Sequence, residues 1–427
     1  MLFEGDGVGR GASGECQRPL GGNMSFNPLT EKGINLDEQV RNWAELNVEP
    51  YDKASVDPYT RCRVIAMNGI EVEAVIFSHQ FNRHTDVPEV KAALAEIRRI
   101  EQQQQKVVNW LIPAEESTLE VTLGYEQEAV DLTAWLARSE PDPYLRQTYD
   151  FGLLEDFDHL YRYANLYELI EGKQAEDVVA RLTEVMPGRP TRVEHRHPAD
   201  NIRKHYDRHT VDPLSRLHAL TITAAEQQTM NFYMNIGNRY LEPVARGLYA
   251  EIGMVEEEHV TQYESMLDPG ESWFEQLLLH EYNECYMYHS FEAQESDPRI
   301  RRIWELHLAM EIEQLRIAAD LMRRYDGRDP LEVLPAALPE PVLLEPNKQY
   351  VREVLADQVD LTSLGTGYVR DAHKRFQENL KRVNAAGNPS EEVIDIHRER
   401  FGREYRLQTE GPHPVRELRE EAFAGQA

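Results

Sequence analysis

The chain has little cysteine, no long apolar run and few basic residues for its many acids. Its 427 residues include only Cys16, Cys62 and Cys285, which lack the close spacing of a zinc or iron–sulfur site and the density of a disulfide scaffold. No run of about 18 apolar residues could cross a bilayer, and the Gly-rich start has no apolar signal core. These absences predict a reducing, cytoplasmic location and no membrane span.

The charge balance excludes two further classes of partner. The sequence has 46 basic and 75 acidic residues, a net charge of -29. Such a charge repels phosphate backbones and anionic lipid, so we expect neither a nucleic-acid partner nor a membrane partner. An apolar content of 41% is enough for a large buried core.

Composition divides the chain into four parts. We expect a disordered N-terminal segment at 1–23, an N-terminal extension at 24–86, a helical domain at 87–325, and a Pro-rich arm with C-terminal helices at 326–427. Residues 60–77 are rich in Val and Ile and alternate weakly, which predicts a short strand pair with Asn68-Gly69 as its turn. The arm suggests wrapping or assembly, so we expect a homo-oligomer.

Helical periodicity dominates the central domain, and proline divides it into segments. The expected helices cover 87–112, 114–138, 142–172, 213–239, 242–267, 271–294 and 297–325. Residues 173–212 form a long connection between the third and fourth of these helices.

One hairpin pattern occurs three times in these helices. Its turns are Asp142-Pro143, Glu242-Pro243 and Asp297-Pro298. Thirteen residues after each proline stands an acid, and three residues later a histidine or glutamine: Asp156 and His159, Glu256 and His259, Glu311 and Gln314. Thirty residues before those acids stand Glu126, Glu226 and Glu281.

Each of these acids interrupts an otherwise apolar helix face. Burying an unpaired carboxylate costs several kcal/mol, so such a face needs a cation, a proton or a paired base. A separation of thirty residues across a tight turn places the two acids of a hairpin opposite each other. The pattern therefore predicts one layer of carboxylates and imidazoles.

This layout resembles the ferritin-like di-metal carboxylate superfamily, in which two helices each give a Glu and two others give Glu-x-x-His. Glu256-Glu257-Glu258-His259 matches that motif, and Asp156-Phe157-Asp158-His159 matches it with Asp for Glu. The resemblance implies an all-α, ferritin-like four-helix bundle core with an added helical hairpin and a C-terminal arm. It also implies two iron ions, or manganese and iron, and an oxidase or oxygenase that uses dioxygen or peroxide on an unknown small substrate.

The first two hairpins are the expected site, because the connection 173–212 is long enough for the crossover of such a bundle. The third hairpin ends in Gln314 and is expected to be a degenerate flank that covers the site. The predicted metal ligands are Glu126, Asp156, His159, Glu226, Glu256 and His259. The histidines would be terminal ligands, and Glu226 or Asp156 would bridge the ions.

Tyr163 and Tyr263 each follow a site histidine by four residues. This is the spacing of the redox tyrosine in the small subunit of class I ribonucleotide reductase, which the chain resembles here. The resemblance implies a catalytic role in electron relay. Packing in the core is the alternative. The chain has no reductase, flavin or rubredoxin-like segment, so the electron donor is expected to be external.

Several alternatives stay open from the sequence. Glu101, Glu128, Glu281 or Glu311 could join the metal site or lie beside it. Single buried acids could instead pair with Arg146 or Arg246 of the hairpin turns. A ferroxidase or iron-handling protein without an organic substrate, and a metal-free structural scaffold, are the alternative functions.

Overall fold

Long helices make up the body of the molecule. The computed structural model describes residues 26–335, 337–358 and 372–419. Within these ranges the β-pairing is limited to an isolated bridge between Val185 and Leu407, so the all-α prediction is confirmed. The long helices are α3 (Pro58–His84), α4 (Pro88–Asn109), α5 (Thr118–Ser139), α6 (Pro143–Glu171), α8 (Pro213–Ile236), α9 (Pro243–Glu264), α10 (Trp273–Gln294) and α11 (Pro298–Leu321). The shorter helices are α1 (Leu36–Gln39), α2 (Trp43–Leu46), α7 (Glu176–Val179), α12 (Lys348–Gln358), α14 (Ala372–Val383) and α15 (Pro389–Phe401).

Asp-Pro pairs fix where four of the long helices begin. In each pair the aspartate side chain accepts a hydrogen bond from the backbone N–H two residues later, and proline occupies the first helical position. The distances are 2.7 to 2.9 Å at Asp57, Asp142, Asp212 and Asp297. From α4 to α11, the long helices lie within a few residues of their predicted bounds.

The predicted strand pair over residues 60–77 is wrong, because these residues form the middle of α3. Asp57 and Pro58 start the helix, and α3 then contacts α4, α5, α8 and α10. A helix surrounded in this way is apolar on most sides and shows no clear stripe at helical spacing. Its Val and Ile residues therefore suggested strands, although they pack between helices.

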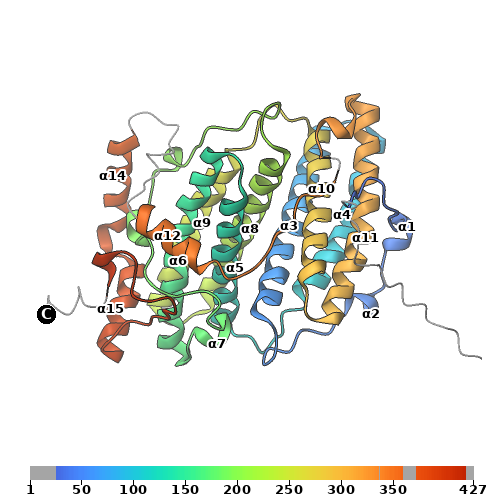
Figure 1. Cartoon of the computed structure of the whole chain (residues 1–427). Helices are drawn as coiled ribbons and strands as arrows, with labels where there is room; N and C mark the ends of the chain where they lie inside the picture. The colour runs from blue at the N-terminus through green and yellow to red at the C-terminus, as the bar shows by residue number, and fades with distance from the viewer. Residues whose placement is uncertain (1–25, 336, 359–371, 420–427) are drawn as a thin grey trace, which may run out of the picture.

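The eight long helices form two groups of four that lie side by side (Figure 1). We call α5, α6, α8 and α9 the inner bundle, because they come from the middle of the chain. We call α3, α4, α10 and α11 the outer bundle. The third predicted hairpin, α10 with α11, thus pairs with α3 and α4 and completes a second bundle instead of serving as a flank.

The sequence contains two copies of one pattern, offset by 155 residues, which start at Tyr51 and Tyr206. Both copies begin with Tyr-Asp, followed by Val-Asp-Pro: Val56-Asp57-Pro58 in the first and Val211-Asp212-Pro213 in the second. The offset carries α3 to α6 onto α8 to α11. Each bundle therefore contains one hairpin from each half of the chain.

Equivalent contacts recur at equivalent positions of the two halves. Arg61 of α3 donates to Glu116 at 2.8 Å, and Arg216 of α8 donates to Glu271 at 2.8 Å. All four side chains are buried. Glu116 precedes α5 and Glu271 precedes α10, so each ion pair joins one bundle to the other.

A second pair of equivalent contacts holds the hairpins together within each bundle. Glu140, at the end of α5, lies 2.8 Å from Nδ1 of His218 on α8. Glu295, at the end of α10, accepts from Nε of Arg63 on α3 at 2.9 Å. These buried groups lock the end of one hairpin to the start of the other.

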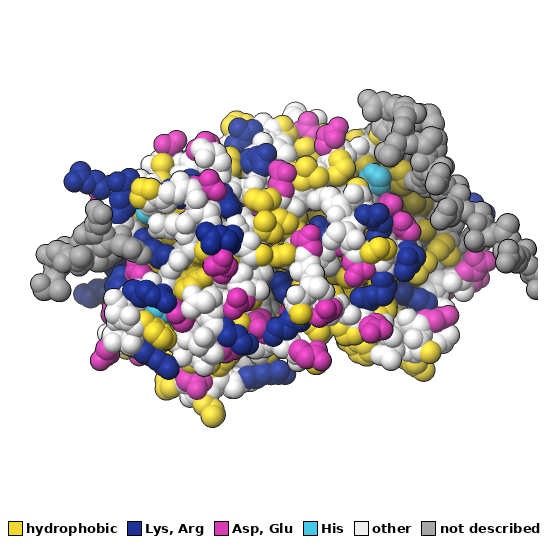
Figure 2. All heavy atoms as spheres, turned by 60° about the horizontal axis from the view of Figure 1, so that its bottom comes forward, with side chains coloured by type: hydrophobic (Ala, Val, Ile, Leu, Met, Phe, Trp, Pro, Cys, Tyr) yellow, Lys and Arg dark blue, Asp and Glu magenta, His cyan; other side chains and the backbone are white. Residues whose placement is uncertain are grey.

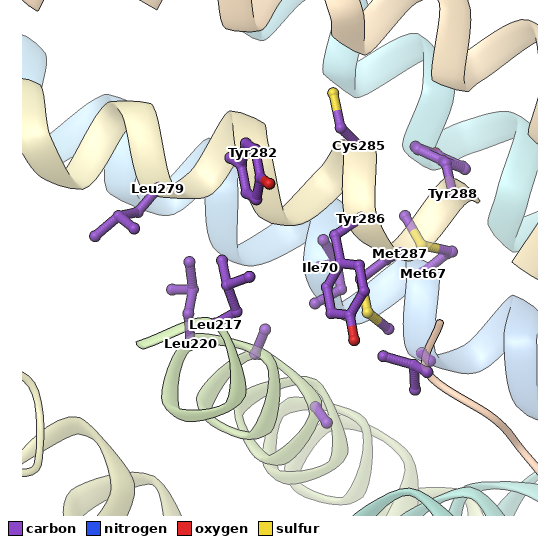
Figure 3. Packing of buried hydrophobic residues seen from close by; sticks show 14 of the residues in the cluster. Met67, Ile70, Leu217, Leu220, Leu279, Tyr282, Cys285, Tyr286, Met287 and Tyr288 are labelled. Carbon is purple, nitrogen blue, oxygen red and sulfur yellow. The ribbon is translucent and has the colours of Figure 1, made fainter. Parts of the chain in front are cut away.

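Helices α3, α8 and α10 enclose the apolar core between the bundles. Figure 3 shows Ile70 of α3, Leu217 and Leu220 of α8, and Tyr286 of α10 gathered in the space between these helices. All four are buried. Packing of this kind holds the two bundles in a fixed relation.

The Pro-rich arm lies against its own chain. Tyr286 donates to the carbonyl of Glu340 at 2.6 Å, and the N–H of Val342 donates to Ser290 at 3.0 Å. Beyond this segment α12 packs on α6, and α15 packs on α9 and α6. The segment around Glu340 and Val342 thus lies on α10 of the outer bundle, whereas α12 and α15 cover the inner bundle. Homo-oligomer formation stays a prediction, and the predicted disordered segment 1–23 lies outside the described residues.

Charge is distributed unevenly between the surface and the interior. On the face in Figure 2, Lys and Arg side chains are interspersed with Asp and Glu side chains. Among the buried charged side chains, carboxylates far outnumber guanidinium groups. Part of the acid excess therefore lies in the core, where it needs compensation. None of the described helices is both long enough and apolar enough to cross a membrane.

Gly69→Val is expected to destabilise the protein, because α3 and α8 cross closely at this residue. A Cβ at Gly69 would lie 3.0 Å from the carbonyl oxygen of Ala224 and 3.2 Å from Cβ of Gln228. Overpacking of this kind costs about 1–3 kcal/mol. Gly253→Ala on α9 is the control: its Cβ would lie 3.4 Å from Cβ of Tyr233, so alanine should be neutral or stabilising. Chemical denaturation measures both, and wild-type stability of Gly69→Val would contradict the close crossing.

Candidate metal centre

The four helices of the inner bundle each bring a carboxylate to one level of its interior. Helices α5 and α6 form one antiparallel pair and α8 and α9 the other, so acids thirty residues apart face each other across the pair. The structure brings all six predicted metal residues together, and none is more than 2% exposed: Glu126, Asp156, His159, Glu226, Glu256 and His259.

These side chains form two groups that share Glu256. Within each group, ligand atoms lie within 4.8 Å of one another: Asp156, Glu226, Glu256 and His259 in the first, and Glu126, His159 and Glu256 in the second. Nδ1 of His159 lies 3.0 Å from Oε1 of Glu256, and Nδ1 of His259 lies 3.1 Å from Oε2. Each oxygen of Glu256 faces one imidazole, and Glu256 is the residue that the two groups share. A bridging role for Glu226 or Asp156 stays a prediction.

Several oxygens of the cluster have no hydrogen-bond partner among the described residues, although Nδ1 of His259 lies 3.4 Å from Oδ1 of Asp156 and 3.5 Å from Oε1 of Glu226. The oxygens without a hydrogen bond are Oε2 of Glu126, Oδ1 of Asp156 and Oε1 of Glu226. Arg146, which could have paired with a site acid, instead donates to the backbone carbonyl of Glu140 at 2.5 Å. The four carboxylates would balance the charge of two divalent cations beside neutral imidazoles. The donor set therefore fits two metal ions.

The pKa values of the cluster reflect the lack of positive charge. Burial, followed by neighbouring carboxylates, raises the pKa of Glu126 and of Asp156 far above the usual range. Burial also raises the pKa of Glu226 to about 8, although His259 opposes the shift. Burial raises the pKa of Glu256 as well, but the two imidazoles outweigh it and hold that pKa at about 2. These shifts predict that protons occupy part of the cluster in the absence of a cation, and that a metal ion binding there would displace them.

Glu155 of α6 and two arginines of the long connection support His259 on the side of its ring that faces away from the cluster. Nε2 of His259 pairs with Glu155, so its Nδ1 is the nitrogen that faces the cluster. Glu155 in turn accepts from Arg196 at 2.8 Å and from Arg189 at 3.2 Å. Burial raises the pKa of Glu155, but Arg196 and His259 outweigh it and hold that pKa well below the usual range. A carboxylate in this position orients a metal-binding histidine.

Neither Glu155 nor Arg196 was predicted. Glu155 directly precedes Asp156, and this pair of consecutive acids is the available sequence signal. Because consecutive helical residues point to different sides, Glu155 does not share the predicted ligand face of Asp156. Arg196 comes from an irregular loop whose path carries no periodic signal.

The tyrosine that contacts a candidate ligand was also not predicted. Tyr233 of α8 donates to Oε1 of Glu126. The predicted Tyr163 lies behind it, with a distance of 5.2 Å between the two ring centroids. The predicted Tyr263 lies beside His259, with 6.2 Å between ring centroids. Both predicted tyrosines are buried close to the site. The ring of Tyr163 packs against Tyr233, and Tyr233 in turn contacts the candidate ligand Glu126.

The other open residues lie outside the two groups. Glu128 is buried on α5, and burial raises its pKa to about 8, but it belongs to neither group. Glu101, Glu281 and Glu311 lie on helices of the outer bundle. The candidate site is therefore built from the first two predicted hairpins.

Comparison with protein-family models, with curated proteins and with solved structures gave no match to this chain. The interpretation of the site therefore depends on its residues and their geometry.

Glu126→Gln is expected to weaken metal binding at least about 10-fold, because it removes a charged oxygen from the group that contains His159. Glu128→Gln is the matched control on the same helix, since Glu128 is equally buried and lies outside both groups. Anaerobic equilibrium dialysis with ferrous iron, followed by metal analysis, measures both. If Glu128→Gln weakened metal binding and Glu126→Gln did not, then Glu128 would be the ligand in place of Glu126.

The free energy of unfolding of the metal-free protein is expected to fall as pH rises from about 4.5 to about 8. In the folded state Glu226 keeps its proton up to a pKa of about 8, against the ordinary value of 4.5. In this window the unfolded chain binds fewer protons, so stability falls by up to about 1.4 kcal/mol per pH unit. Glu226→Gln should flatten this part of a pH series of urea denaturations. An unchanged slope would contradict the raised pKa.

Proposed function

We propose that the inner bundle is a ferritin-like bundle that holds two iron ions, or one manganese and one iron, and that the protein is an oxidoreductase. The observation that carries this proposal is the position of Glu256 between two ligand groups, each with one histidine. Mixed carboxylate and imidazole donors suit iron and manganese. When bound, the metal pair would supply the electrons that reduce dioxygen or peroxide.

The chain's own residues would hold and shield this pair. His159 and His259 would bind one ion each, and Glu256 would hold both. Glu155 would fix the ring of His259, because it takes the nitrogen that faces away from the cluster. The complete burial of the ligands excludes bulk water, which strengthens electrostatic interactions and limits side reactions.

Buried tyrosines would carry electrons between the site and an external donor. Tyr233 donates a hydrogen bond to Glu126, and the ring of Tyr163 lies next to that of Tyr233. Tyr263 has the equivalent place beside His259. We infer that Tyr163 and Tyr263 serve as relay residues on opposite sides of the cluster.

A small substrate would dock between the two bundles. A cleft of about 660 Å³ there is lined by Tyr125 of α5 and Gln228 of α8, among other residues. Tyr125 directly precedes Glu126 in the sequence. Nε2 of Gln228 donates a hydrogen bond to the hydroxyl of Tyr125 at 3.2 Å. These two side chains would separate a bound substrate from the metal ligands.

Metal analysis after anaerobic reconstitution with ferrous iron tests the shared position of Glu256. Glu256→Ala is expected to lose about two ions per chain relative to the wild type, and His159→Ala about one. Glu257→Gln, on the same helix but outside both groups, is the control and should lose none. Unchanged iron content in Glu256→Ala would contradict the proposal.

Exposure to dioxygen then separates the functions. The wild type should oxidise its bound iron within the site, whereas Glu256→Ala should not. Growth of a ferric mineral beyond the bound pair would favour iron handling over an oxidase or oxygenase.

A further inference from the structure

The outer bundle repeats the layout of the inner bundle at the offset of 155 residues. Its acids are the repeat partners of Glu126, Asp156, Glu226 and Glu256, in that order: Glu281, Glu311, Glu71 and Glu101. Gln314 and Gln104 stand where the inner bundle has its two histidines. The outer bundle thus keeps the four carboxylates and replaces both imidazoles by amides.

A fifth acid completes a compact group in this bundle. Glu284 of α10 stands where the inner bundle has Ala129. Carboxylate oxygens of Glu101, Glu281 and Glu284 lie within 4.8 Å of one another, and all three side chains are at most 2% exposed. Two helices, α4 and α10, therefore bring three carboxylates to one point.

Unpartnered oxygens surround this point. Neither oxygen of Glu284 has a hydrogen-bond partner, and Oε2 of Glu101 and of Glu281 has none either. The side chain of Gln314 is fully buried, and its Nε2 donates to Glu311 at 3.2 Å. That bond fixes the amide and leaves Oε1 of Gln314 without a partner. A buried amide oxygen without a hydrogen bond needs a ligand such as a cation or a water molecule.

No histidine of the described residues belongs to this group, although α3, α10 and α11 all carry histidines. Nδ1 of His307 lies 2.9 Å from the hydroxyl of Tyr288, which also donates to Glu71. The available ligands are therefore oxygens from carboxylates and an amide. Burial and the neighbouring Glu311 raise the pKa of Glu101 to about 8, which is consistent with missing positive charge.

We propose that the outer bundle holds a second cation site, made entirely of oxygen ligands, for a hard divalent cation. Glu101, Glu281 and Glu284 would bind the ion. Glu311, which interacts with Glu101 and Glu284, would complete the oxygen shell together with Gln314, which donates to Glu311. Oxygen-only donor sets suit Mg²⁺, Ca²⁺ and Mn²⁺, whereas the imidazoles of the inner bundle suit iron. The two bundles would thus bind different metals in one chain.

Binding of Mn²⁺ to the full chain tests this site. In the variant Glu281→Gln/Glu284→Gln we expect about one Mn²⁺ per chain fewer than in the wild type, because two charged ligands are lost. Glu256→Ala should keep this ion, since it alters the inner bundle only. Glu305→Gln, an exposed acid on α11, is the control and should bind as the wild type does. Excess Ca²⁺ or Mg²⁺ should release this ion and leave iron in the inner bundle.

Glutamine carries no charge, so the double variant should fold without metal at least as stably as the wild type. In the Glu256→Ala background, in which the inner bundle no longer holds metal, Mn²⁺ should raise Tm, and adding Glu281→Gln and Glu284→Gln should abolish that rise. If the double variant bound as much Mn²⁺ as the wild type, the proposal would be overturned. Bound protons would then neutralise the buried carboxylates of the outer bundle. Should that variant fail to fold, a crystal of the wild type soaked in Mn²⁺ decides by its anomalous signal. A peak between Glu101, Glu281 and Glu284 supports the site, and an empty outer bundle overturns it.

Discussion

The rest of the structure depends on one constraint, which is that carboxylates lie in a helical interior without enough guanidinium groups beside them. Where arginines reach the interior, they form defined ion pairs such as Arg61 with Glu116 and Arg196 with Glu155. The acids at the centre of each bundle lack arginine partners, and several of their oxygens have no hydrogen-bond donor. Because an unpaired buried carboxylate is costly, protons or bound cations must supply the missing charge.

The repeated halves explain why two such centres exist. Each half supplies two hairpins, but a half does not close a bundle with its own hairpins, because each bundle combines one hairpin from each half. Each centre therefore forms only when distant parts of the chain come together. The crossing of α3 and α8 at the repeat partners Gly69 and Ala224 sets how closely the two bundles approach.

The two centres then differ in the residues around a common frame of four acids. The inner bundle has histidines, and Glu155 orients one of them with the help of Arg196. In the outer bundle the repeat partner of Glu155 is Met310, and the histidine positions hold glutamines. Imidazole with a fixed orientation suits redox metals, whereas amide and carboxylate oxygens suit hard cations. Under the two proposals, the same fold would offer two kinds of metal site.

The sequence by itself determined the long helices from α4 to α11 and the level of the acids on them. Both follow from local physics, since Asp-Pro pairs cap helices and thirty residues return an antiparallel pair to the same height. Only the tertiary structure decided that residues 60–77 form a helix, since α3 owes its apolar character to neighbours on most sides. It also decided that the third hairpin pairs with α3 and α4, that Glu256 lies between two histidines, and that Glu155 and Tyr233 support the ligands. These features depend on contacts between residues far apart in the chain, which local propensity and periodicity do not encode.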